Sequence, residues 1–133
     1  MGSVDENGYL GPLQRLLHED PAFGHRNHLA LGWTYLQMTD QATAEGWMRS
    51  AIRRVASMHG RPEKYHETLM IAWMRLVAHH VRMRKQTSFD EFIAHNAGLL
   101  DRRLPGNHYS RDLLQGTTAR TTWVDPDLSP FPK

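Results

Sequence analysis

Apolar residues recur with the period of an α-helix along most of this chain, and that pattern constrains the fold more than any other feature. The clearest stripe comprises Ala44, Trp47, Met48, Ala51, Ile52, Val55 and Met58. Apolar residues spaced three and four apart lie on one face of a helix with 3.6 residues per turn. No segment shows the apolar-polar alternation that is typical of a half-buried strand. The sequence therefore predicts an all-α fold.

Capping residues and prolines indicate where the helices begin and end. Gly11-Pro12 can open a short first helix, which must stop before Pro21 because the residue preceding a proline is pushed out of the α region. Thr39 and Asp40 are N-cap candidates, and Ser88 with Glu91 forms the pattern of a capping box. The four main helices are predicted near residues 24–38, 41–60, 62–80 and 88–100.

The connections between these four segments are short, which favours antiparallel neighbours. The predicted architecture is therefore a compact bundle of four main helices, followed by an irregular, proline-rich C-terminal tail. Helical turns within the tail are expected near residues 109–114 and 117–124. The prolines and glycines that interrupt the tail are Pro105, Gly106, Gly116, Pro126, Pro130 and Pro132.

Length and composition are those of one ordinary domain, since the chain has 133 residues and a formal net charge of +2. Residues 1–10 are polar and contain glycine, so we expect a flexible or appended segment there and a single helical domain over residues 11–133. The chain has neither an apolar run of about 18 residues nor the features of a signal peptide, so a cytoplasmic protein without membrane contact is expected. Acidic residues interrupt the basic clusters, which argues against a nucleic-acid partner.

The histidines carry the most specific functional pattern. The chain has nine histidines and no cysteine, so a metal ion would need nitrogen or oxygen ligands. His25 and His28 are three residues apart on a predicted helix, which places their Cβ atoms about 5–6 Å apart on one face. His66 lies on the apolar stripe of the third predicted helix, and packed helices are about 8–10 Å apart. These three imidazoles are therefore predicted to bind one metal ion with an open coordination position, as catalytic sites do.

Other residues complete the predicted site. Glu63 is proposed as a second-shell acceptor for His66, although a solvated glutamate at a helix start is the ordinary alternative. Glu67 is the candidate general base, against the alternative of a surface salt bridge. The predicted pocket wall consists of Trp33, Tyr65, Met70 and Trp73. His79 and His80 are adjacent, so at most one can face the core. The other histidines receive no role because they lie near predicted helix ends or loops; they are His18, His59, His95 and His108.

The leading functional hypothesis is a small metal-dependent enzyme that acts on a small molecule. Imidazole ligands suit a divalent first-row transition metal such as Cu, Fe or Zn, and oxidative, lyase and hydrolytic chemistry all stay open. Alternatively, each histidine has an ordinary hydrogen-bond partner, because an unpaired buried ring costs about 1–3 kcal/mol. The chain would then be a metal-free small-ligand or protein-interaction module. A haem site that uses one histidine and Met70 is a third possibility.

Three segments carry a family resemblance. They are Phe23 to Leu29 (F-G-H-R-N-H-L), Lys64 to Thr68 (K-Y-H-E-T) and Ala119 to Asp127 (A-R-T-T-W-V-D-P-D). Together they resemble a group of small bacterial helical proteins without a secure activity, over roughly residues 12–130. The resemblance implies a stand-alone domain and draws attention to the three histidines above. It implies no mechanism.

Overall fold

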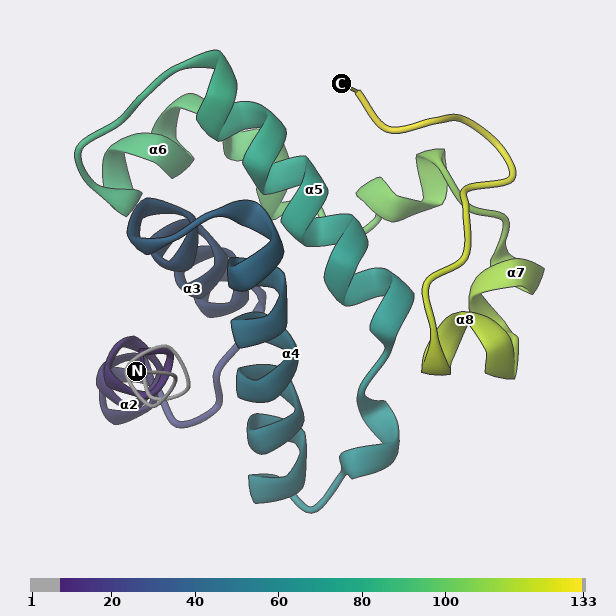
Figure 1. Ribbon diagram of the computed structural model, residues 1–133, viewed down its shortest axis with the longest axis horizontal. Helices are drawn as coiled ribbons and strands as arrows, with labels where there is room; N and C mark the ends of the chain where they lie inside the picture. Colours follow the sequence, from purple (N-terminus) through teal and green to yellow (C-terminus); the bar gives the residue numbers. More distant parts are fainter. Residues whose placement is uncertain (1–7, 133) are drawn as a thin grey trace. The chain divides into compact units, whose positions relative to one another are not determined.

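The computed structural model describes residues 8–132, which form seven α-helices and three 3-10 helices and contain no strand (Figure 1). This result confirms the predicted all-α fold. Backbone contacts divide the chain into two compact units, one ending at Tyr65 and the other starting at His66. The four-helix bundle and the single domain stay predictions. Most of the segment predicted to be flexible lies outside the described residues, and Leu10 already belongs to the first described helix.

The first unit is built around one central helix, α3, which contacts both α2 and α4. Its elements are α2 (Leu10–Glu19), α3 (His25–Met38), α4 (Gln41–Met58) and the 3-10 helix η1 (Pro62–Lys64). Tyr35 of α3 is completely buried, its hydroxyl donates a hydrogen bond to the Tyr9 carbonyl oxygen (2.6 Å), and its ring meets that of Trp47 edge to face. Burial raises the pKa of Tyr35 above its ordinary value. The apolar stripe predicted for α4 supplies the buried Ala44, Ala51 and Val55.

The start of α4 follows the predicted signal. The Asp40 carboxylate accepts a hydrogen bond from the Thr43 amide (2.8 Å), which confirms Asp40 as the N-cap of α4.

Phe23, two residues before α3, has a φ of 51° although it is not glycine. That left-handed conformation costs a residue with a Cβ atom roughly 1–2 kcal/mol. The Phe23 ring is buried, and its centroid lies 5.1 Å from that of His28, so burial of the ring offsets the backbone strain.

The second unit is organised along one long helix, α5, which contacts α8 and η3. Its elements are α5 (Glu67–Met83), α6 (Phe89–His95), η2 (Ala97–Leu100), η3 (Leu104–Asn107), α7 (Arg111–Gln115) and α8 (Thr117–Thr121). Its core includes the buried Met74, Val77, Phe92, Leu99 and Tyr109. The helical turns predicted near residues 109–114 and 117–124 are confirmed as α7 and α8. Residues 123–132 have no helix or strand, and the irregular, proline-rich tail as a whole stays a prediction.

Helix α5 begins later than the sequence predicted. Pro62 opens only a 3-10 turn, Tyr65 and His66 are extended, and the α-helix starts at Glu67. His66 is therefore the N-cap, and its ring Nδ1 accepts a hydrogen bond from the Leu69 amide (3.1 Å). The prediction that one α-helix runs from residue 62 is wrong because extended backbone at Tyr65 and His66 separates Glu63 from α5.

None of the helices in residues 8–132 combines the length and the apolar character that a membrane crossing requires.

The cap of α6 provides a direct test of the capping analysis. The Ser88 hydroxyl accepts a hydrogen bond from the Glu91 amide (3.2 Å), as predicted, and the Glu91 carboxylate accepts one from the Thr87 hydroxyl. Ser88→Ala removes the cap, so we expect the free energy of unfolding to fall by about 1 kcal/mol in urea titrations. Ser88→Asn keeps an acceptor and should lose less. Equal stability of the wild type and Ser88→Ala would contradict this assignment.

Candidate functional site

The predicted metal ligands lie in different units. His25 and His28 are in the first turn of α3, whereas His66 starts the second unit. Among residues 8–132, no three or more histidine, cysteine, aspartate or glutamate side chains are grouped so that they could hold a metal ion. The three-histidine site and its Cu, Fe or Zn ion stay predictions.

Both ring nitrogens of His66 have backbone partners. Nδ1 accepts the Leu69 amide proton, and Nε2 donates to the Leu114 carbonyl oxygen (2.8 Å). A metal ion needs a free lone pair on one nitrogen, so ligation would break one of these bonds. Burial lowers the pKa of His66; the hydrogen bond to Leu114 opposes this shift, and the positive charge of Arg120 adds to it. The ring is therefore held neutral, with its proton on Nε2.

The two glutamates have contrasting environments. Glu63 is exposed and accepts a hydrogen bond from Arg61 Nε (2.9 Å), which lowers the pKa of its carboxyl group. This contact supports the alternative of a solvated glutamate over a second-shell role. Glu67 is buried, with 7% of its surface exposed, rather than lying on the surface. Its role as a general base stays a prediction.

The predicted pocket residues differ in burial. Tyr65 and Met70 are buried, whereas Trp33 and Trp73 are partly exposed. The Arg53 guanidinium lies 4.9 Å from the centroid of the Tyr65 ring. The pocket itself stays a prediction.

The start of α5 is hydrogen-bonded to a segment about 50 residues further along the chain. Thr68 is completely buried, and its hydroxyl donates to the Thr122 carbonyl oxygen (2.8 Å) and accepts from the Val124 amide (3.2 Å). The Tyr109 hydroxyl donates to the Val124 carbonyl oxygen (2.7 Å). Two segments named in the family resemblance, which include Thr68 and Val124, therefore bind each other. Hydrogen bonds therefore hold both the amide group and the carbonyl group of Val124.

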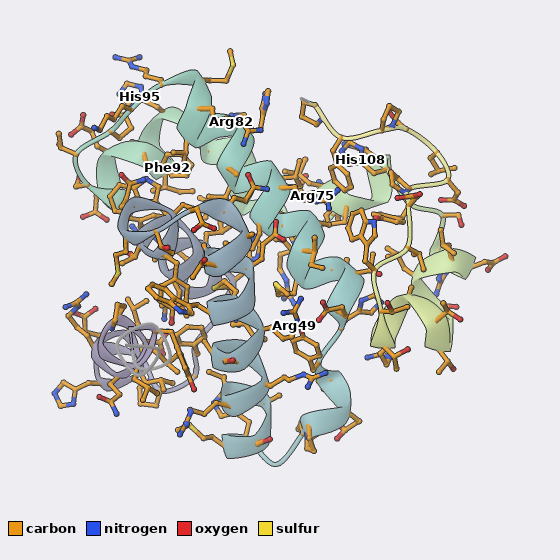
Figure 2. All side chains as sticks on the ribbon, in the orientation of Figure 1. Arg49, Arg75, Arg82, Phe92, His95 and His108 are labelled. Carbon is orange, nitrogen blue, oxygen red and sulfur yellow. The ribbon has the colours of Figure 1, made fainter. Side chains whose placement is uncertain are left out.

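Three aromatic residues of the second unit, His108, Tyr109 and Trp123, form what we call the aromatic site. Tyr109 is buried and meets the Trp123 ring edge to face at 6.2 Å. The Arg75 guanidinium of α5 lies 4.1 Å from the Trp123 ring centroid, a cation–π contact that orients the indole. Figure 2 labels Arg75 on α5 and His108 in the segment before α7. Burial raises the pKa of Tyr109 to about 12, so its hydroxyl stays protonated as a donor.

The aromatic site is occupied by the chain's own C-terminal segment. The Phe131 ring stacks on His108 with centroids 4.3 Å apart, and it lies 5.9 Å from Tyr109 and 6.1 Å from Trp123. The backbone of the segment is also bound. The Leu128 amide donates to the His108 carbonyl oxygen, and His108 Nδ1 donates to the Ser129 carbonyl oxygen, both at 2.9 Å.

A carboxylate adds a further contact next to the aromatic site. The Ser110 amide donates to Asp127 Oδ1 (2.8 Å), and hydrogen bonds from Ser110 lower the pKa of Asp127. Residues 127, 128 and 129 are thus bound in succession by Ser110 and His108. This site was not predicted from the sequence. His108 lies near a predicted helix end or loop, and Phe131, which stands between two prolines, shows no helical periodicity.

Comparisons with protein-family models, curated proteins and solved structures find no match. The resemblance to small bacterial proteins stays a prediction. A function for this chain therefore has to follow from the geometry of its own residues.

Proposed function

We propose that this chain is a metal-free protein-interaction module that binds an extended peptide segment at the aromatic site. The observation that carries this proposal is the binding of residues 128–131 there by two hydrogen bonds to their backbone groups and one stacked ring. Recognition of main-chain groups together with one anchoring side chain is a common way in which proteins bind extended peptides. The proposal corresponds to the interaction-module alternative from the sequence.

The bound segment indicates what such a ligand must contain. The hydrogen bonds from the Leu128 amide and to the Ser129 carbonyl oxygen use backbone atoms, so many different side chains are compatible with these two positions. The Leu128 side chain is 59% exposed and contributes little. Phe131, by contrast, contacts three rings, and each aromatic pair contributes about 0.5–1.5 kcal/mol beyond the apolar area that it buries. An aromatic residue is therefore the anchor.

Proline on both sides of the anchor lowers the entropy cost of binding. Pro130 and Pro132 have a fixed φ near −65°, and each pushes the residue before it towards extended backbone. Ser129 and Phe131 are those residues. A segment that is already extended when free loses little conformational freedom on binding. The proposed ligand class is thus an extended peptide with an aromatic residue flanked by prolines.

The test uses the full chain with Phe131→Ala, which removes the anchor from the site. The probe is a peptide with the sequence of residues 125–132, and binding is followed by calorimetry and by NMR signals of the His108, Tyr109 and Trp123 rings. We expect saturable binding that shifts these ring signals. A probe with Phe131→Ala should bind at least about tenfold weaker, which corresponds to the loss of roughly 1.4 kcal/mol. A probe with Leu128→Ala is the matched control and should bind like the original peptide.

Two results would overturn this proposal. One is the absence of saturable binding to the folded Phe131→Ala chain. The other is equal binding of the Phe131→Ala and Leu128→Ala probes. A titration with Cu²⁺ or Zn²⁺ addresses the competing hypothesis of a metalloenzyme. Stoichiometric metal binding that His66→Asn abolishes would favour the three-histidine site instead.

A further inference from the structure

We infer that residues 127–131 act as a built-in competitor that closes the aromatic site until a partner peptide displaces them. This inference rests on the proposed function and adds its regulation. The segment makes three kinds of contact there, through a carboxylate, paired backbone groups and an aromatic anchor. They are supplied by Asp127, by Leu128 and Ser129, and by Phe131.

The competitor is tethered directly beside the site. Val124 is fixed by hydrogen bonds to Thr68 and Tyr109, and Asp127 binds Ser110 only three residues later. Pro126 restricts the connection further, since it holds Asp125 near extended backbone. A ligand on so short a tether has an effective concentration of about a millimolar or more. A free peptide at lower concentration therefore cannot compete unless the tether is weakened.

The segment can leave without breaking the hydrogen bonds that hold Val124. Its attachments are the bond between Ser110 and Asp127, the two bonds to His108, and the contacts of the Phe131 ring with the three rings of the aromatic site. Leu128, Ser129 and Pro130 are exposed. Release would remove the contact between the Tyr109 and Phe131 rings, but the hydrogen bonds of Thr68 and Tyr109 end at Val124, before the competitor begins. Release would thus uncover the aromatic site and leave its walls in place.

Displacement also specifies the partner more narrowly. The Ser110 amide accommodates a carboxylate, and Asp127 lies four residues before Phe131. A peptide that replaces every contact of the competitor needs a carboxylate four residues before an aromatic residue flanked by prolines. The partner is therefore an acidic, proline-containing extended segment.

The experiment compares affinity for the peptide of residues 125–132 in four chains. They are the wild type, Asp127→Ala, Leu128→Ala and a chain that ends after Pro126. We expect Asp127→Ala and the shortened chain to bind the peptide at least about tenfold more tightly than the wild type. Leu128→Ala should match the wild type because its side chain points to solvent.

The outcomes separate this inference from the proposed function. If all four chains bind the peptide equally, the site exists but the competitor does not, and the inference is overturned. If the folded Phe131→Ala chain does not bind it, the proposed function itself fails. Asp127→Ala decides the question if the shortened chain is unstable, because the replaced side chain is on the surface. Circular dichroism and thermal unfolding show whether each chain is folded.

Discussion

Thr68→Val is expected to lower the free energy of unfolding by about 2–4 kcal/mol, although the two side chains have almost the same size. The Thr68 hydroxyl has two backbone partners, the Thr122 carbonyl oxygen and the Val124 amide. Valine would leave both groups unpaired in a partly buried position, and each unpaired group costs about 1–3 kcal/mol. Urea unfolding followed by circular dichroism measures the difference.

Thr68→Ser is the matched control for this prediction. It keeps the hydroxyl and removes one buried methyl group, so a loss of roughly 1 kcal/mol is expected. If Thr68→Val proved no less stable than Thr68→Ser, the hydroxyl would not be joining α5 to residues 122–124.

The second large effect concerns His66. His66→Ala is expected to cost about 2–3 kcal/mol near neutral pH, because it removes a helix cap worth about 1 kcal/mol, the hydrogen bond to Leu114, and a buried ring. His66→Asn retains a capping oxygen for the Leu69 amide and should lose about 1 kcal/mol less than His66→Ala. Equal losses in the two variants would contradict the capping role of the ring.

The same residue should make stability depend on pH. Burial lowers the pKa of His66 in the folded chain. Above the pKa of about 6.5 that the ring has in the unfolded chain, it is neutral in both states, and its contribution to the free energy of unfolding does not change with pH. As the pH falls below about 6.5, the unfolded chain takes up the proton first, and the folded state loses stability until its own pKa is passed. The difference in the free energy of unfolding between the wild type and His66→Asn should therefore shrink as the pH falls below about 6.5. Urea titrations at several pH values test this, and a constant difference would show that the ring does not titrate differently on folding.

The helices could be predicted where their signals are local. Asp40 and Ser88 cap their helices as expected, since each side chain reaches an amide only three residues away. The start of α5 was placed too early because Pro62 and Glu63 have the composition of a helix start. Histidine is an uncommon N-cap, so nothing in the sequence indicated that His66 would take that position.

The contacts of the site could not be predicted because they connect distant parts of the chain. The partner of the His66 ring is 48 residues away, and those of the Thr68 hydroxyl are 54 and 56 residues away. Helical periodicity carries no information about such pairs. The aromatic site is hidden for a related reason, since its rings come from the turn between η3 and α7 and from a segment with no regular structure. Only the composition of the tail, with Trp123 and Phe131 among prolines, could have drawn attention to it.

The bond between Thr68 and Val124 also sets an order of events during synthesis on the ribosome. Val124 is added 56 residues after Thr68. At about 5–20 residues per second, this interval lasts roughly 3–11 s. The first unit is complete before it begins, because that unit ends at Tyr65. During this time the amino-terminal turn of α5 lacks its final hydrogen-bond partners. The nascent chain therefore exposes Thr68 and neighbouring residues that are buried after folding, and a chaperone could bind them.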